Sequence, residues 1–232
     1  MKNLFVTGTD TDVGKTLISC GLLTAFQKQG LSTLGYKPIS AGCEKAPQGL
    51  VNDDAAQLLA CSSIEVSLSE VNPIAFEPPI APHIAANLVD ATIDSHAVTD
   101  GWMHLARKRP DVLLTEGAGG WSLPINDYQT LPEVLLPLDM KVVMVVGMRL
   151  GCLNHALLTA NTIQQQGFTL SGWIANHLSN DMPYAEENIQ TLEQHLEAPL
   201  IGKVPYLTST DASLDVYEHV AQYLNPSRLL GN

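Results

Sequence analysis

Basic residues are scarce in this chain of 232 residues. Twelve lysines and arginines stand against twenty-four aspartates and glutamates, so the formal net charge is −12 at pH 7. An acidic surface repels the phosphate backbone of nucleic acids, and we therefore expect no nucleic-acid partner. Nucleotide binding stays open, because a local nest of backbone N–H groups can hold phosphate whatever the net charge of the chain.

Cysteines and long apolar runs are also rare. The four cysteines, Cys20, Cys43, Cys61 and Cys152, are far apart and form no CxxC pair. This spacing argues against a disulfide framework or a zinc site and favours free thiols in a reducing compartment. No segment approaches the roughly 20 apolar residues that span a bilayer, and residues 1–7 lack the basic region and cleavage site of a signal peptide. We therefore expect a cytoplasmic protein without a membrane partner.

Strand-like and helix-like segments alternate along most of the chain. Hydrophobic residues make up 45% of the sequence, enough for a full core, and the length suits one domain over residues 1–232. Strands are predicted at residues 4–6, 33–36, 111–115, 141–146, 170–175 and 200–204. Helices are predicted at residues 17–29, 52–60, 93–108, 154–166 and 183–196, with one more amphipathic helix in the tail at 208–232. The proline-rich stretch 71–82 predicts a long surface connection.

The apolar run of residues 142–146 suits a strand that is buried on both faces, as parallel sheets require. Together with the strand–helix alternation, it predicts an α/β fold with a doubly wound, mostly parallel sheet and helices on both faces. In such a sheet, ligands gather at the carboxyl ends of the strands. The polar motifs of the sequence all fall at those ends.

Residues 8–16, GTDTDVGKT, follow a predicted strand and open a predicted helix. This context is typical of a P-loop, in which backbone N–H groups and the helix dipole bind a triphosphate. Lys15 would reach the terminal phosphates, and the Thr16 hydroxyl would ligate Mg²⁺. Five residues separate Gly8 from Gly14, instead of the usual four, so Thr9 takes the usual first-glycine position. The alternative is an ordinary glycine turn between a strand and a helix.

Three charged residues stand where they could complement this loop. Lys37 stands at the carboxyl end of the second predicted strand, where its side chain would point towards the nucleotide crevice. The alternative is that Lys37 is a solvated lysine of a surface loop. Asp54 lies at a helix start, where an acid can serve as a cap, although capping by Asn52 or Asp53 would leave it free to reach a metal. Glu116 ends a buried-looking strand before a run of glycines, where P-loop enzymes place the acid that holds Mg²⁺ or its water. The alternative there is a glycine turn beside a surface acid.

Three further segments follow predicted strands. Residues 151–155 open a helix whose free N–H groups suit a carboxylate. Within this segment, Cys152 is expected to be a buried, inert thiol and His155 a surface or core histidine. Asn176 and His177 close one strand, and Pro205, Tyr206 and Leu207 close the last one, at the place where the base of a nucleotide would lie.

In this order and at these spacings, the motifs resemble those of the dethiobiotin synthetase family over nearly the whole chain. They are VTGTDTDVGKT (6–16), GYKP (35–38), NDDA (52–55), PHIAA (82–86), EGAGGW (116–121), GCLNHALLT (151–159), GWIAN (172–176) and GKVPYL (202–207). The resemblance implies an ATP- and Mg²⁺-dependent cyclo-ligase of biotin biosynthesis. Such an enzyme joins CO₂ to 7,8-diaminononanoate through a carbamate and a carbamic–phosphoric anhydride, and releases dethiobiotin, ADP and phosphate.

The resemblance also implies roles for individual residues. Lys37, Lys15 and Thr11 match the catalytic positions, and Thr16, Asp54 and Glu116 match the metal ligands. The ATP-binding positions are Asp12, Val13, Gly14, Lys15, Thr16, Leu17, Asp54, Glu116, Gly117, Ala118, Gly119, Asn176, His177, Pro205, Tyr206 and Leu207. The substrate-binding positions are Thr11, Lys37, Ala41, Gly119, Gly151, Cys152, Leu153 and Asn154. The last four resemble a segment that receives the substrate carboxylate from a neighbouring subunit, which implies a homodimer with sites at the subunit interface.

Two positions depart from the family pattern. Ala41 stands where the family usually has Ser or Thr as a substrate contact, so Ser40 or a backbone group takes over, or the contact is missing. His177 stands where the residue is often acidic, which leaves the choice of nucleotide base open.

Two other functions of P-loop proteins would require features that the sequence lacks. A cobyrinate-type amide synthetase normally carries a glutaminase domain with a nucleophilic Cys and its His, and this chain has neither the length nor such a pair. A nucleotide-switch ATPase of the dimer-forming P-loop class would carry a lysine at the position of Asp10, and a guanine-specific switch would carry an NKxD motif. Neither is present in the sequence.

Overall fold

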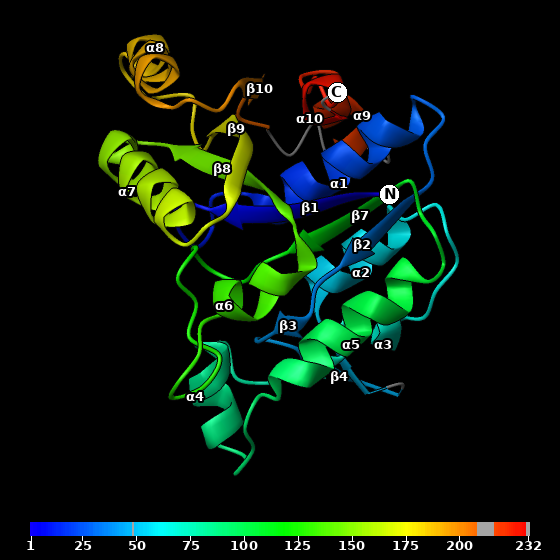
Figure 1. The fold of residues 1–232 in the computed structure, drawn as a ribbon. Coiled ribbons are helices and arrows are strands. Elements are labelled where there is room, and N and C mark those ends of the chain that lie inside the picture. Colours follow the sequence, from blue (N-terminus) through cyan, green and yellow to red (C-terminus); the bar gives the residue numbers. More distant parts are fainter. Residues whose placement is uncertain (48, 208–215, 231–232) are drawn as a thin grey trace.

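A six-stranded, wholly parallel sheet runs through the computed structural model, which describes residues 1–47, 49–207 and 216–230 (Figure 1). Its strands lie in the order β10-β9-β8-β1-β7-β2. Their bounds are Lys2–Gly8 (β1), Thr33–Tyr36 (β2), Val112–Glu116 (β7), Lys141–Met148 (β8), Thr169–His177 (β9) and Leu200–Val204 (β10). All six correspond to predicted strands, so the predicted fold class is confirmed.

Helices cover both faces of this sheet (Figure 1). On one face pack α5 (Ser95–Ala106), α6 (Leu131–Leu135), α7 (Cys152–Gln165) and α8 (Ala185–His195). On the other pack α1 (Lys15–Gln27), α2 (Asp53–Ala60), α3 (Leu68–Val71), α9 (Val216–Ala221) and α10 (Ser227–Leu230). The predicted tail helix falls on α9 and α10, while residues 208–215 and 231–232 lie outside the described residues.

The central strand β8 shows why the sequence makes this sandwich. Val142, Met144 and Val146 are buried in the core on one face, and Val143 and Val145 are buried in the core on the other. Side chains alternate between the faces of a strand, so an unbroken apolar run fits only a strand with helices on both sides. Within the described ranges, none of the helices combines the length and apolar character that a bilayer crossing requires.

Several short elements were not predicted. They are β3 (Ile39–Ser40), β4 (Glu44–Ala46), β5 (Gly49–Val51), β6 (Ile74–Ala75), α3, α4 (Pro82–Asn87), α6 and a 3₁₀ turn at Leu136–Leu138. The prediction of a surface connection at residues 71–82 is wrong for its first part. Val71 and Asn72 are buried, and β6 pairs in parallel with β3. Prolines disfavour the interior of a helix, although α4 begins at Pro82, and they do not show that the chain hydrogen-bonds to a distant segment.

The packing of the tail on β10 gives a test of the fold. A Cβ on Gly202 would clash with the backbone carbonyl oxygen of Tyr223 and would lie 2.9 Å from Cδ2 of Leu224. Gly202→Ala should therefore cost about 1–3 kcal/mol of overpacking, which in a chain of this size lowers the melting temperature by roughly 2–4 °C per kcal/mol.

Thermal denaturation of purified protein measures this effect. The control is Lys203→Ala, which removes an exposed side chain that pairs with Glu186 at the surface; this variant should melt close to the wild type. A Gly202→Ala protein as stable as the wild type would contradict the described packing of the tail.

Candidate active site

A cavity of about 810 Å³ opens at the carboxyl ends of β1, β2 and β7. Its lining comes from five segments far apart in the sequence. They contribute Thr11, Asp12, Gly14, Lys15, Thr16 and Leu17; Lys37, Ser40 and Ala41; Asn52 and Asp54; Pro79, Ile80, Ala81 and Pro82; and Ala118, Gly119, Gly120, Ser122, Leu123 and Pro124. Most of the predicted phosphate, metal and substrate residues therefore meet at one site.

The loop between β1 and α1 has the shape that its sequence predicts for phosphate binding. Gly14 is the N-cap of α1 with φ of 85°, a conformation that favours glycine, and a Cβ there would clash with the side-chain amide of Asn176. Asn176 is buried and donates from Nδ2 to the Val13 carbonyl at 2.8 Å, so a side chain from the end of β9 fixes the backbone of the loop. The Lys15 ammonium donates to the carbonyl of Asp10 at 3.3 Å.

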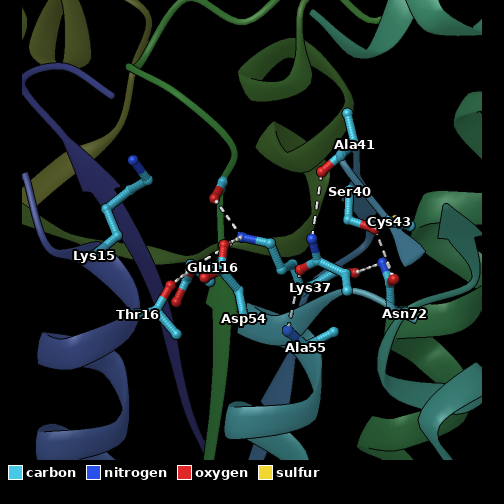
Figure 2. A network of polar contacts seen from close by, with 12 residues as sticks. Lys15, Thr16, Lys37, Ser40, Ala41, Cys43, Asp54, Ala55, Asn72 and Glu116 are labelled. Carbon is cyan, nitrogen blue, oxygen red and sulfur yellow. Dashed lines mark hydrogen bonds and ion pairs between the residues drawn. The ribbon is translucent and has the colours of Figure 1, made fainter. Parts of the chain in front are cut away.

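Next to this loop lies a cluster of charged groups in which Lys37 and Glu116 are buried and Asp54 is partly exposed (Figure 2). The Lys37 ammonium contacts Glu116 Oε1 at 2.8 Å and Asp54 Oδ2 at 3.2 Å. Thr16 donates its hydroxyl to the same Glu116 oxygen at 2.8 Å. The Lys37 side chain is 4% exposed and that of Glu116 is 0% exposed. The alternatives of a solvated lysine and a surface acid are therefore wrong.

Opposing effects set the pKa values of the two lysines. Burial acts to lower the pKa of Lys37, but the negative charges of Glu116 and Asp54 outweigh it, and the pKa rises above the ordinary value. For Lys15, burial is the largest effect and lowers the pKa, while Glu116 partly offsets it and the nearby Lys37 charge adds to it. Lys37 is therefore held firmly as an ammonium ion.

Asp54 is free for this cluster because another residue caps its helix. Asn52 is the N-cap of α2, and its Oδ1 accepts from the backbone N–H of Ala55 at 3.2 Å. Glu116 has a free oxygen as well. Its Oε2 is buried without a hydrogen-bond partner among the described residues. Directly behind the cavity, this carboxylate therefore keeps one oxygen whose hydrogen-bonding capacity is unused among the described residues.

The glycines after Glu116 allow close approach. A Cβ on Gly117 would lie 3.0 Å from the Phe5 ring, and Gly119 has φ of 65°. Where a Cβ of Gly119 would stand, the Thr11 hydroxyl oxygen is 3.7 Å away. The predicted catalytic Thr11 therefore lies next to the glycine loop, and both line the cavity.

The structure narrows the question raised by Ala41. Ser40 is buried, and its hydroxyl donates to Oδ1 of Asn72 at 2.7 Å, so it is already bound (Figure 2). Ala41 lines the cavity with a methyl group, and its carbonyl accepts from Asn52 Nδ2 at 3.3 Å. A replacement contact in which the Ser40 hydroxyl donates to substrate would require this bond to Asn72 to break, because the hydroxyl has one hydrogen to donate.

Three of the residues predicted for the base, His177, Pro205 and Tyr206, line a separate small hollow of about 240 Å³, whereas Asn176 and Leu207 are not part of its lining and the Asn176 amide donates to the phosphate loop. The hollow is lined by His177, Ser179, Asn180, Met182, Ala185, Pro205 and Tyr206. Burial lowers the pKa of His177, which favours its neutral form. This hollow joins the ends of β9 and β10, as the predicted positions of the two segments require.

The segment at the start of α7 lies apart from both hollows. Among the described residues that line the main cavity, none comes from Gly151, Cys152, Leu153 or Asn154. Cys152 is buried, and burial raises the pKa of its thiol, as expected of an inert cysteine. Just before this segment, Arg149 forms an ion pair with Asp10 of the phosphate loop.

Sequence reasoning did not predict several wall residues of the cavity. Residues 79–82 belong to the stretch taken for a surface connection, and residues 122–124 follow the glycine loop. The motif PHIAA, which begins at Pro82, was the one signal that pointed to the first of these walls. The second carried no signal beyond its nearness to Trp121.

Known proteins match this chain along most of its length. A family model described as an AAA domain matches residues 2–213. An ATP-dependent dethiobiotin synthetase from Cellvibrio japonicus is 49% identical over 211 residues, which are 91% of this chain and 92% of that protein. Enzymes of the same name from Alteromonas mediterranea and Vibrio vulnificus are 46% and 41% identical, over 91% and 99% of this chain and 95% and 99% of their own length.

Solved structures with the same fold are more distant in sequence. The MinD cell division protein of Aquifex aeolicus has a TM-score of 0.59 at 16% identity and covers 100% of this chain and 98% of its own. A ParA family ATPase from Chlorobium tepidum has a TM-score of 0.54 at 16% identity, with coverage of 98% and 96%. These two likenesses show the fold alone, whereas the identities above show that the chain belongs to the ATP-dependent dethiobiotin synthetase family.

Proposed function

We propose that this chain is an ATP-dependent ligase of biotin biosynthesis that joins CO₂ to 7,8-diaminononanoate and closes the ureido ring of dethiobiotin. One observation carries the proposal for this chain's own residues. Lys37 lines the same cavity as Lys15 and Thr16 of the phosphate loop, and the fully buried Glu116 pairs with it from behind the cavity wall. A positive charge beside a triphosphate site suits the transfer of a phosphoryl group to an anionic acceptor.

The reaction has three steps. One amine of the substrate adds to CO₂ and loses a proton, which gives a carbamate. A carbamate oxygen then attacks the γ-phosphorus of ATP, the bond to the bridging oxygen breaks, and ADP leaves. Finally the second amine attacks the carbonyl carbon of the mixed anhydride, the C–O bond breaks, and phosphate and a proton leave as the ring closes. Such chemistry needs mainly positioning and neutralisation of charge.

The cavity residues suit these needs. Lys37 would bind the carbamate and stabilise the charge on its oxygens, and its raised pKa keeps it cationic for that task. Lys15 would bind the terminal phosphates. Thr11, which lies next to Gly119 in the cavity wall, would contact the carbamate or the γ-phosphate. Residues 79–82 and 123–124 offer apolar surface for the aliphatic chain of the substrate.

We infer Mg²⁺ as the metal, held by Thr16, Asp54 and Glu116. These groups present oxygen ligands of the kind that Mg²⁺ prefers, and the unpartnered, buried Oε2 of Glu116 fits a cation. The bound ion would supply positive charge to the phosphates during transfer. The Lys37 ammonium also pairs with the Asp54 and Glu116 carboxylates, so these two acids have a positively charged partner from the chain itself.

A homodimer belongs to the same proposal. The start of α7, with Gly151, Cys152, Leu153 and Asn154, would bind the carboxylate of a substrate held by the neighbouring subunit. Two observations support it: this segment lies outside the cavity of its own chain, and Leu150 and Leu158 beside it are 100% and 59% exposed. The four cysteines are free thiols, which agrees with the proposed cytoplasmic location.

The function is tested by phosphate release from Mg·ATP, measured with and without 7,8-diaminononanoate and bicarbonate. We expect release that requires both, and a product with the mass of dethiobiotin. Release that ignores the diamine would contradict the proposal and would favour a switch ATPase.

Lys37→Gln tests the role of the lysine. Because the charge acts on the carbamate, turnover should fall by roughly a hundredfold or more, while the affinity for ATP, measured by equilibrium binding, should stay close to that of the wild type. The control is Lys45→Gln, which removes an exposed lysine paired with Glu77 and should keep full activity. Near-normal turnover of Lys37→Gln would refute the assignment.

Glu116→Gln tests the metal site. The amide is a weaker ligand than the carboxylate, so the Mg²⁺ concentration needed for half-maximal turnover should rise, and direct Mn²⁺ binding should weaken. Glu193→Gln, on the exposed side of α8, serves as the control that loses the same charge far from the cavity. An unchanged Mg²⁺ dependence in Glu116→Gln would exclude Glu116 as a ligand.

A further inference from the structure

The backbone of Lys37 lies at a point where the chain leaves the main sheet. β2 ends at Tyr36, and Pro38, which follows Lys37, has no N–H to offer. Buried backbone groups at such a point need partners from elsewhere. The segment after α3 supplies them: Lys37 N–H donates to the Val71 carbonyl at 2.9 Å, and Ile74 N–H donates to the Pro38 carbonyl at 3.2 Å.

The side chain of Asn72 completes this attachment (Figure 2). Its Nδ2 donates to the Lys37 carbonyl at 2.7 Å and to the Ile74 carbonyl at 3.3 Å. Its Oδ1 accepts from the Ser40 hydroxyl at 2.7 Å. Two carbonyls on one side and a hydroxyl on the other fix the orientation of the amide, because only Nδ2 can donate to a carbonyl. Asn72 is 7% exposed, so water does not compete freely for these bonds.

Asn72 is itself firmly held. It is the C-cap of α3, and its N–H donates to the Leu68 carbonyl at 2.8 Å. The other end of α3 has a capping box between Ser67 and Glu70, and Glu70 also pairs with His104 and Lys108 near the end of α5. The amide therefore connects Lys37 to a fixed part of the fold.

These contacts hold the two ends of Lys37 separately. Glu116 and Asp54 bind its ammonium, whereas Val71 and Asn72 bind its backbone N–H and carbonyl. A lysine side chain has four flexible carbons, so the place of its charge depends on where the backbone is fixed. Asn72 is not among the described residues that line the cavity, and it reaches the cavity through its contacts with Lys37 and Ser40.

We propose that Asn72 is a positioning residue for the ligase reaction, which fixes the backbone of Lys37 and, through Ser40, the cavity wall at Ala41. The proposal rests on the role of Lys37 in the proposed function. The amide acts through the lysine and makes no contact with substrate. This role accounts for the packing of the segment that follows α3 against Lys37, the residue after β2.

Asn72→Ala is the main test, measured as kcat beside the equilibrium affinity for ATP. A displacement of the lysine by about 1 Å would lower kcat by roughly ten- to a hundredfold, with ATP affinity unchanged because the phosphate loop is not touched. Asn3→Ala is the matched control. It also removes a hydrogen bond from an Asn amide to a backbone carbonyl, that of Leu138, but far from the cavity, and it should keep the wild-type kcat.

Ser40→Ala is the second variant, in case Asn72→Ala does not fold. It removes one of the three bonds of the Asn72 amide and leaves both bonds to carbonyls in place. A smaller fall in kcat, again without a change in ATP affinity, is expected. Wild-type kcat in both variants would overturn the proposal, as would a loss of ATP affinity in step with kcat or an equal fall in Asn3→Ala.

Positioning is also measured without turnover, from the NMR signal of the ε-carbon of Lys37 in protein with ¹³C-labelled lysines. Asn72→Ala should shift or broaden this signal, and Asn3→Ala should leave it as in the wild type. An unchanged signal in Asn72→Ala would overturn the proposal even if the wild type made no dethiobiotin. That second result would instead count against the proposed function.

Discussion

The buried ion pair between Lys37 and Glu116 is the constraint on which the rest of the site depends. Taking two charges out of water is costly, and the cost is offset only by close geometry and further hydrogen bonds. Both are present, because Glu116 Oε1 receives the Lys37 ammonium and the Thr16 hydroxyl, each at 2.8 Å. Removal of the Lys37 charge would leave the Glu116 carboxylate buried without this counter-charge, at a cost of about 3–5 kcal/mol, whereas Lys37 without Glu116 would keep its pair with Asp54.

The strand order of the sheet makes this pair possible. β7 lies between β1 and β2, with Val6 of β1 opposite Glu116 and Tyr36 of β2 opposite Thr115. In a parallel sheet these strands end at the same edge, so Glu116 meets the phosphate loop on one side and Lys37 on the other. The glycine loop after Glu116 then leaves room for ligand between them. A site for phosphoryl transfer therefore follows from the order of three strands.

Much of this could be predicted from the sequence, because it depends on local patterns. The six strands and five long helices fall within about two residues of the predicted places, and the residues at the strand ends were recognised as polar groups of one site. The burial of Lys37 could not be predicted, because its partner Glu116 is 79 positions away. The role of Asn72 was missed for the same reason, since its bonds to Lys37 and Ser40 close a loop that prolines suggested was exposed. The use of the α7 start depends on a second chain, which one sequence does not describe.

The central claim is that Glu116 and Asp54 hold Lys37 as a buried ammonium ion. The most direct measurement is an NMR pH titration of Lys37 in protein with ¹³C-labelled lysines, assigned by its loss in Lys37→Gln. The account predicts that Lys37 stays charged above the pH at which an ordinary lysine loses its proton, because its pKa is raised by the two carboxylates. A Lys37 that loses its proton at a lower pH than an ordinary lysine would show that burial outweighs the ion pairs, and would contradict the account.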